Sequence, residues 1–429
     1  MRLSFPAETV SCALFFDSPD GEVASDTKVT ENPPVLRLKR GEARRLRAGH
    51  CWIFSNEVDT AATPLKAFTP GDPVLIEAAG GKPVGWGYVN PHSLIAARLV
   101  SRDVSQPMSL RLLAERLATA RSLREACFDL PYYRAAFGEA DGLPGLVVDR
   151  FGDYLVAQVT TAGMERVLET IIEALRRVYE PRSILLRNDG AIRELEGLER
   201  YSRVALGEFP ERVEVVENGC RFLANPLGGQ KTGWYYDHRT NRARLSRLAK
   251  GRRVLDLFSY IGAWGVQLAV AGAEQVTCVD ASPGALEMAG ENAERNGVTG
   301  GFELLQGDAF DVLAHLRGEG RRYDLVVLDP PAFIKRRKDY RKGVEAYRRL
   351  NQAAMQLVEP GGLLLSASCS HHLEVETLRD LLLRSARHLD RTLQIIDAGG
   401  QAADHPVHPA IPETAYLKAL LTRILPGAW

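Results

Sequence analysis

A short apolar strand that runs into a glycine turn constrains the fold of this chain more than any other feature. The strand and turn span Arg253–Gly262, and the next strand ends on Asp280, 18 residues beyond Gly262. In α/β nucleotide sites an acid at an offset of roughly 20 residues holds a ribose hydroxyl. The turn lacks the G-x-G-x-x-G pattern, so the pyrophosphate cradle of a dinucleotide site is missing. A ribose-binding acid without that cradle favours a nucleoside cofactor, and S-adenosylmethionine is the common one.

From about residue 213 onward, apolar strands alternate with helices, which predicts a doubly wound parallel sheet. The expected strands are 254–257, 276–280, 302–305, 325–328, 363–366, 393–396 and 416–424. A lone acid at a strand end is usually a helix cap. Here four of the first five strand exits carry an acid, namely Asp256, Asp280, Asp308 and Asp329. Because ligands of such sheets gather at the carboxyl ends of the strands, this set indicates a binding edge.

The chain before that sheet divides by composition. Short β-like runs separated by glycine and proline predict a β-rich barrel or sandwich, with strands near 73–77, 83–89 and 94–100. A mixed segment follows, with helices expected at 109–126 and 164–178. We therefore expect an extension (1–32), a β-rich domain (33–105), a central α+β domain (106–212) and a C-terminal α/β domain (213–429).

Composition excludes few function classes. No apolar run approaches the roughly 18 residues of a transmembrane helix, so we expect no membrane partner. Six cysteines without C-x-x-C spacing argue against a metal site and favour a reducing cytoplasm. The net charge is zero, but basic residues cluster at 37–47 and 335–349. Such clusters either bind phosphate backbones or form solvated helix faces.

The segment Asp329–Phe333 reads Asp-Pro-Pro-Ala-Phe directly after an expected strand. Prolines fix φ and withhold donors, so this turn is stiff. A carboxylate and an aromatic ring on a stiff turn suit a flipped base, which needs hydrogen bonds to its polar edge and a surface to stack on. The alternative is an ordinary turn with Phe333 in the core.

Cys369 follows the fifth expected strand, between two serines and just before His371 and His372. A cytosolic cysteine is usually a small buried hydrophobe. On the ligand edge it suits a nucleophile, because a thiolate added to C6 of a pyrimidine makes C5 enamine-like and able to take a methyl group. A few per cent of the thiol is ionised at neutral pH, and we expect nearby basic groups to raise that fraction.

The chain from about residue 35 to its end resembles the large-subunit ribosomal RNA methyltransferase I family, which are S-adenosylmethionine-dependent cytosine-C5 enzymes. The motifs that carry the resemblance are 137–150, 230–233, 237–239, 329–333, 368–370 and 404–418. The resemblance implies an N-terminal PUA-like RNA-binding domain and a class I (Rossmann-like) methyltransferase domain. It also implies that Cys369 is the nucleophile and that Gln230, Lys231 and Thr232 form a flap near the cofactor.

The sequence differs at one position from the wider class of RNA cytosine-C5 methyltransferases. Many RNA cytosine-C5 methyltransferases carry a second cysteine after the fourth strand, which assists product release, and here that position reads Pro330-Pro331. Either another group takes the C5 proton or the chemistry differs. Two alternatives stay open: methylation of an exocyclic amine or guanine N7 without a cysteine, and a catalytically inert RNA-binding protein.

The expected site has three groups of residues. Catalysis is assigned to Cys369 and Asp329, with the Asp329 carboxylate at the N3 and N4 edge of the base. Asp280 is expected at the ribose, Asp308 at the adenine amino group and Gly262 at the methionine moiety. The full cofactor set is Gln230, Lys231, Thr232, Asp256, Phe258, Ser259, Tyr260, Gly262, Asp280, Ala281, Ser282, Asn296, Asp308, Ala309 and Asp329. The substrate set is Pro330, Pro331, Phe333, Lys335, Arg336, Arg44 and Arg45. The expected partner is ribosomal RNA, and the oligomeric state is open, a homodimer included.

Overall fold

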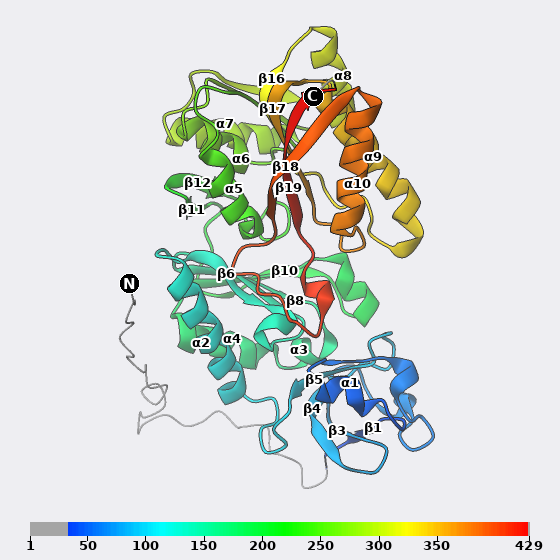
Figure 1. Ribbon diagram of the computed structural model, residues 1–429. Helices are drawn as coiled ribbons and strands as arrows, with labels where there is room; N and C mark the ends of the chain where they lie inside the picture. The colour runs from blue at the N-terminus through cyan, green and yellow to red at the C-terminus, as the bar shows by residue number, and fades with distance from the viewer. Residues whose placement is uncertain (1–32, 428–429) are drawn as a thin grey trace, which may run out of the picture.

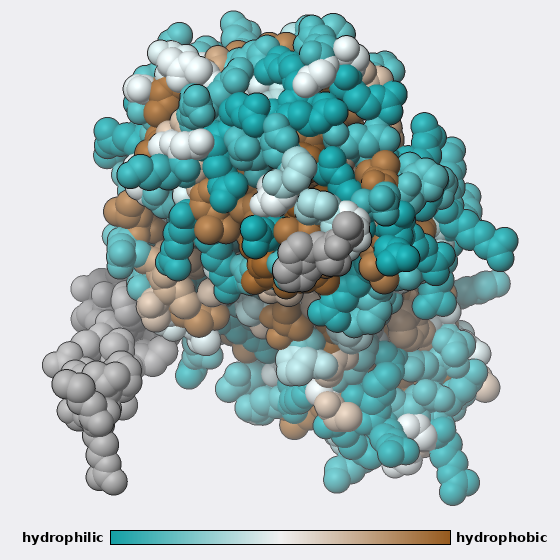
Figure 2. Space-filling view, turned by 45° about the horizontal axis from the view of Figure 1, so that its top comes forward, coloured by the Kyte–Doolittle hydropathy of each residue, from teal (hydrophilic) through white to brown (hydrophobic). Residues whose placement is uncertain are grey.

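The computed structural model describes residues 33–427, so the expected 1–32 extension lies outside the described residues. Three large sheets follow one another along the molecule, with the N-terminal sheet at one end and the C-terminal sheet at the other (Figure 1). No helix in residues 33–427 is long and apolar enough to cross a membrane. On the face drawn in Figure 2, hydrophobic residues form small separate groups among hydrophilic ones.

The N-terminal sheet has five strands in the order β1-β3-β4-β5-β2. Its elements are β1 (Val35–Arg37), α1 (Ala43–Arg47), β2 (Trp52–Ile53), β3 (Asp72–Glu77), β4 (Pro83–Val89) and β5 (Ala97–Ser101). The strand expected from residue 94 begins only at Ala97. A turn occupies the preceding residues, because the Asn90 side chain accepts a hydrogen bond from His92 N and leaves Leu94 exposed.

The central sheet also has five strands, in the order β10-β9-β8-β7-β6. Its elements are α2 (Leu110–Cys127), β6 (Tyr132–Phe137), β7 (Leu146–Phe151), β8 (Tyr154–Val159), α3 (Ala162–Arg166), α4 (Leu168–Tyr179), β9 (Ser183–Asn188) and β10 (Tyr201–Leu206). Ser109 caps α2 by accepting a hydrogen bond from Leu112 N. The helix expected near 164–178 is confirmed for most of its length, but it is not continuous: the chain forms α3 and α4, which divide at Val167.

The C-terminal sheet has seven strands in the order β15-β14-β13-β16-β17-β19-β18. Every pair is parallel except those of β19. The strands are β13 (Arg253–Leu257), β14 (Gln275–Asp280), β15 (Phe302–Gln306), β16 (Tyr323–Leu328), β17 (Val358–Ser368), β18 (Arg391–Gly399) and β19 (Lys418–Pro426). The expected class I methyltransferase fold is confirmed, and its strand order reverses between β13 and β16, where such sheets bind ligands.

Helices cover both faces of this sheet. One layer consists of α5 (Arg239–Ser246), α6 (Ala263–Val270) and α7 (Pro283–Arg295), and the other of α8 (Ala309–Gly318), α9 (Tyr340–Met355) and α10 (Val375–His388). Two separate buried clusters fill the space between the sheet and these layers. A hairpin of β11 (Val213–Glu217) and β12 (Cys220–Ala224) precedes the sheet.

The carboxyl edge of the C-terminal sheet faces the central domain across two connecting segments. The segment 225–238 reaches the central domain where Thr232 Oγ1 donates to Asp149 Oδ2 at 2.6 Å. The segment 400–417 reaches it where Arg134 N donates to Asp404 Oδ2 at 3.0 Å. Figure 1 shows the latter segment between β18 and the central sheet. The strand exits therefore open toward an interdomain space rather than toward bulk solvent alone.

Candidate active site

The turn after β13 is tightly bent and is held by Asp280. Phe258 and Tyr260 have positive φ angles of 64° and 50°, and Gly262 has 81°. Asp280 Oδ2 accepts a hydrogen bond from Tyr260 N at 2.9 Å, and Asp280 Oδ1 accepts one from Ser282 N at 2.9 Å. Because each carboxylate oxygen has two lone pairs, the half-buried Asp280 retains capacity to accept ribose hydroxyls.

Asp256 lies beneath this turn rather than on its surface. Its side chain is fully buried, and Oδ2 accepts a hydrogen bond from Gly265 N at the start of α6. Burial raises the pKa of Asp256 to about 8. Its Oδ1 and the buried Ser259 Oγ have no hydrogen-bond partner among the described residues. Asp256 thus holds the turn from below, while unpartnered polar atoms remain around it.

Asp308 occupies the next exit and is exposed. It caps α8, since Oδ1 accepts a hydrogen bond from Phe310 N at 2.9 Å, so the ordinary helix-cap interpretation holds here. Its other carboxylate oxygen has no hydrogen bond to the described residues. The neighbouring Ala281 is exposed, and Ala309 is buried. These exits of β13, β14 and β15 form the cofactor half of the candidate site.

Asn296 does not join the cofactor half. It follows the last turn of α7, at the opposite end of that helix from Ser282, and a helix of this length spans roughly 20 Å. Its side chain accepts from Arg221 N and donates to Arg221 O, which fastens α7 to β12. The expectation that Asn296 contacts the cofactor is therefore wrong.

The flap residues face different ways. Gln230 N donates to Tyr260 Oη at 3.3 Å, so Gln230 adjoins the cofactor half. Lys231 has a φ of 49°, and its ammonium lies 5.0 Å from the centre of the Tyr235 ring. Thr232 is buried with its hydroxyl committed to the central domain, as described above. Thr232 therefore anchors the flap instead of presenting its hydroxyl to a ligand.

At the exit of β16, Asp329 contacts two side chains. His238 Nε2 lies 3.2 Å from Asp329 Oδ1, and Trp264 Nε1 donates to Oδ2 at 3.0 Å. Burial would raise the pKa of Asp329, but the His238 imidazole outweighs it and holds that pKa below its usual range. Burial would likewise lower the pKa of His238, and the carboxylate reverses this shift upward. Asp329 is therefore ionised, and its side chain is 24% exposed.

Cys369 follows β17 and is half-buried. The pKa of its thiol is raised to about 11: burial is the largest cause, the Asp329 and Asp237 carboxylates act in the same direction, and the Lys231 ammonium acts against them. Lys231 thus acts as expected of a nearby basic group, but burial and the two carboxylates outweigh it, so the thiolate fraction is lower than expected, not higher. The rings of His371 and His372 lie next to each other, with centroids 5.1 Å apart and planes tilted by 58°. A reaction at Cys369 needs an acceptor for the thiol proton.

Asp237 was not among the expected site residues, although it lies in one of the motifs. It is buried, and Oδ2 accepts a hydrogen bond from the Tyr416 hydroxyl at 2.6 Å. Its Oδ1 has no partner among the described residues. Burial would raise the pKa of Asp237, but neighbouring histidines and the Tyr416 hydroxyl hold it below its usual range. Asp237, Asp329 and Cys369 form the acceptor half of the candidate site.

The stiff turn beyond Asp329 packs largely against the protein. The half-buried Phe333 ring lies 4.8 Å from the ring of the fully buried Tyr347, and Ile334 N donates to Ser370 Oγ. The structure therefore favours the alternative interpretation, in which Phe333 borders the core. Pro330 is buried, whereas Pro331 and the following Lys335 and Arg336 are exposed.

The N-terminal arginines lie apart from these residues. Arg45 is committed to Glu57, whose two carboxylate oxygens lie 2.7 Å from its guanidinium, so the expectation that it binds substrate phosphates is not supported. Arg44 is exposed on α1, beyond the central domain from the C-terminal sheet (Figure 1). In residues 33–427, no group of three or more histidine, cysteine or acidic side chains could hold a metal ion.

Comparisons with known proteins agree with this architecture. The profile of an S-adenosylmethionine-dependent methyltransferase family matches residues 198–423, and that of a PUA-like domain matches residues 36–102. The chain is 37% identical to ribosomal RNA large subunit methyltransferase I of Aeromonas salmonicida, covering 90% of this chain and 98% of that protein. It is 36% identical to the protein of the same name from Erwinia tasmaniensis, covering 91% and 99%.

A solved methyltransferase structure complexed with SAH has the same fold. It matches 91% of this chain and 100% of its own length, with 21% identity and a TM-score of 0.78. A SAM-dependent methyltransferase from Streptococcus mutans matches with a TM-score of 0.76 at 20% identity. The chain is thus an S-adenosylmethionine-dependent methyltransferase with an N-terminal PUA-like domain.

Proposed function

The chain belongs to the ribosomal RNA large subunit methyltransferase I family, and from this premise we propose that it methylates C5 of a cytosine in large-subunit ribosomal RNA. The observation that carries the proposal is the position of Cys369. It follows β17 on the strand edge that also carries Asp280 and Asp329, so the proposed nucleophile and the proposed ribose-binding acid lie on the same edge of the sheet. The proposed substrate places the protein in the cytoplasm.

The residues of the cofactor half suit S-adenosylmethionine. In this proposal Asp280 accepts hydrogen bonds from the ribose hydroxyls and Asp308 accepts one from the adenine amino group, because both carboxylates retain free lone pairs. At Gly262, where φ is 81°, the chain can pass close to a bound methionine moiety. The bound cofactor supplies an electrophilic methyl group on a sulfonium.

The acceptor half holds and activates the base. The ionised Asp329 carboxylate faces the N3 and N4 edge of the extruded cytosine. Cys369 Sγ forms a bond to C6 while its proton passes to N3, where Asp329 stabilises the positive charge. The C5–C6 double bond opens, and C5 takes the methyl group. The pKa of the thiol is about 11, and the thiolate fraction falls tenfold for each pH unit below that value. Because almost no thiolate is present at neutral pH, the thiol proton must be transferred in this step.

Asp237 completes the proton balance. Many relatives in the wider class use a second cysteine, and Pro330-Pro331 stands at that position here. The Asp237 carboxylate is ionised, has an unpartnered oxygen and lies close enough to affect the pKa of Cys369. It accepts the C5 proton, the C5–C6 double bond re-forms, the C6–S bond breaks, and the departing thiolate recovers the proton from N3.

RNA that contains 5-fluorocytidine tests this function directly. Fluorine at C5 cannot leave as a proton, so the wild-type enzyme with S-adenosylmethionine should form a covalent protein–RNA complex that survives a denaturing gel. Cys369→Ala should form none and should lose methyl transfer by roughly 10⁴-fold or more, while it still binds cofactor. The matched control is Cys127→Ala, since Cys127 is exposed at the end of α2.

Retention of most activity by Cys369→Ala would contradict the proposal. In that case, methylation of an exocyclic amine or of guanine N7 would be the better interpretation. A mass spectrometric map of methylation in the product RNA distinguishes these outcomes.

A further inference from the structure

A basic groove lies beside the acceptor half. It has a volume of about 610 Å³ and is lined by Arg337, Lys338, Tyr340, Arg341, His371, His372 and Glu374. One wall is the 3₁₀ turn and the first turn of α9, which follow the Asp329 turn, and the other wall begins two residues after Cys369. Both walls therefore continue from the strand exits that carry the two proposed catalytic residues. The groove is thus formed by the segments that follow Asp329 and Cys369 in the chain.

The charge of the groove is unbalanced although the whole protein is neutral. The lining contains three cationic side chains and two imidazoles against one carboxylate, that of Glu374. Most arginines elsewhere pair with acids, but none of the three cations lies within ion-pair distance of a carboxylate in residues 33–427. Unpaired cations that line a concave surface favour a polyanionic ligand.

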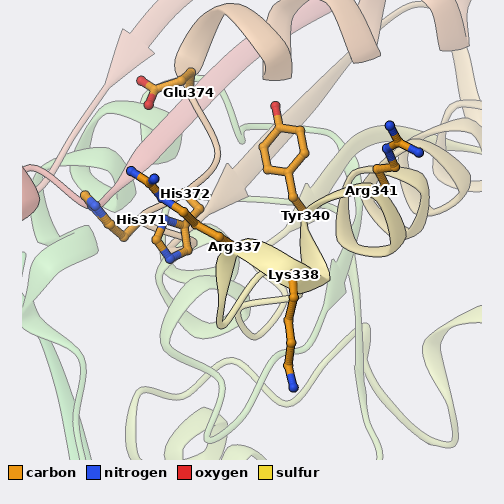
Figure 3. Close-up of a pocket in the computed structure, with 7 residues that line it drawn as sticks. All are labelled: Arg337, Lys338, Tyr340, Arg341, His371, His372 and Glu374. Carbon is orange, nitrogen blue, oxygen red and sulfur yellow. The ribbon is translucent and has the colours of Figure 1, made fainter.

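The exposed aromatic ring of Tyr340 indicates which polyanion the groove would bind. Tyr340 is 36% exposed, and its hydroxyl lies 3.3 Å from Thr377 Oγ1, which orients the ring. In Figure 3, Arg337 reaches toward the two histidines, and Arg341 lies on the other side of the Tyr340 ring. Cations on both sides of an aromatic platform are the arrangement that binds single-stranded nucleic acid, with phosphates on the cations and a base on the ring. An acidic peptide carries no base that would stack on the Tyr340 ring.

We propose that this groove binds the single-stranded RNA next to the target cytosine, with Arg337 and Arg341 on its phosphates and Tyr340 stacked on a neighbouring base. The inference rests on the proposed function only for the identity of the RNA. It goes further by assigning residues that hold the strand after the target base is extruded. His371 and His372 supply additional hydrogen-bond donors at the end nearest Cys369.

Equilibrium binding of a fluorescent, unstructured RNA of about ten nucleotides to the full chain, without cofactor, tests the groove. The double variant Arg337→Ala/Arg341→Ala should bind more weakly. Its plot of log affinity against log salt should be shallower by about 1.4, because each phosphate contact on a single strand contributes roughly 0.7. Tyr340→Leu should weaken binding by roughly 5- to 150-fold with little change in slope, since stacking carries no charge.

The matched control is Arg295→Ala/Arg317→Ala, which removes two exposed arginines from the last turns of α7 and α8, at the opposite edge of the sheet. This variant should leave affinity and slope close to wild type. Calorimetric affinity for S-adenosylmethionine should be unchanged in all variants, which confirms that they are folded.

An unchanged salt slope in the Arg337/Arg341 variant, or an equal loss in the control, would overturn the groove assignment. Equally tight binding of an acidic peptide would overturn the RNA assignment. The outcome is independent of the catalytic chemistry, because the assay contains no methyl transfer. If Cys369→Ala proves active while the groove variants lose RNA affinity, the C5 function fails and the groove stands.

Discussion

The two halves of the candidate site are built from different kinds of contact. In the cofactor half, the acids bind backbone amides of the strand exits themselves: Asp280 binds Ser282 N, two residues away, and Tyr260 N in the turn of the adjacent unit, and Asp308 binds Phe310 N. In the acceptor half, the acids bind side chains from distant segments. Asp237 accepts a hydrogen bond from Tyr416, 179 residues away, and Asp329 accepts one from Trp264. The first half is a local property of strand–turn–helix units, and the second depends on the assembly of the whole chain.

This difference predicts that the halves can be damaged separately. A substitution in the acceptor half should slow the reaction and leave cofactor affinity unchanged. A substitution in the cofactor half should weaken cofactor affinity and leave the chemistry of the acceptor half intact. The three predictions below test that separation, in order of decreasing effect.

Asp237→Asn should give the largest effect, because it keeps the shape and removes the proposed base. We expect the steady-state rate of product release to fall by roughly 10²–10⁴-fold while the first methyl transfer still occurs, with calorimetric affinity for S-adenosylmethionine unchanged. A purely structural role would lower activity without trapping an intermediate. If Asp237 takes the C5 proton, a covalent complex with ordinary cytidine RNA should accumulate and be visible on a denaturing gel.

Tyr416→Phe is the companion variant. It removes the donor to Asp237 Oδ2 and keeps the carboxylate, so its rate should fall less than that of Asp237→Asn. If Asp237→Asn transfers methyl groups at the wild-type rate and accumulates no adduct, another group removes the proton and Asp237 serves packing alone.

Asp280→Ala should give the second effect, and this one falls on binding. Loss of charge-assisted hydrogen bonds should weaken S-adenosylmethionine affinity by about 1.5–3 kcal/mol, measured by calorimetry. Asn296→Ala is the control, because Asn296 lies at the far end of α7 and bonds to Arg221. Unchanged affinity in Asp280→Ala, or an equal loss in Asn296→Ala, would show that the cofactor lies elsewhere.

The same contrast explains what the sequence could predict. The strands at 254–257, 276–280 and 302–305 and the acids at their exits were predictable, because hydrophobic runs, glycine turns and strand-end acids are local signals. Parallel pairing of the strands then places their carboxyl ends at one edge of the sheet, so no other feature of the sequence is needed to bring these acids together. The helix expected at 164–178 was correct in type, but its division into α3 and α4 at Val167 was not predicted. At Gly163 an added Cβ would lie 2.0 Å from the Tyr88 ring, so contact with the N-terminal domain shapes this segment.

The acceptor half could not be predicted in the same way. Cys369 and Asp329 were identifiable from their strands, but the environment of the thiol was not. The groups that set the pKa of Cys369 include Lys231 and Asp237 from a segment more than 130 residues earlier. His371 and His372, which are adjacent in sequence, are not among the main groups that set this pKa. Sequence neighbours were therefore a poor guide to the charge around Cys369, because the fold brings Asp329, Lys231 and Asp237 closer in effect.

The last and smallest prediction concerns that thiol. Alkylation by iodoacetamide requires the thiolate, so its rate at Cys369 should rise about tenfold per pH unit and level off only near pH 11. Mass spectrometry of peptides quantifies Cys369 against the exposed Cys127 in the same sample. Burial is the main cause of the raised pKa, and the Asp329 charge is the second, so Asp329→Asn should lower the pKa and speed alkylation at a fixed pH. A plateau near pH 8 in the wild type would mean that the free enzyme already stabilises the thiolate. In that case the acceptor half would be activated before RNA binds, and proton transfer to the base would not be needed.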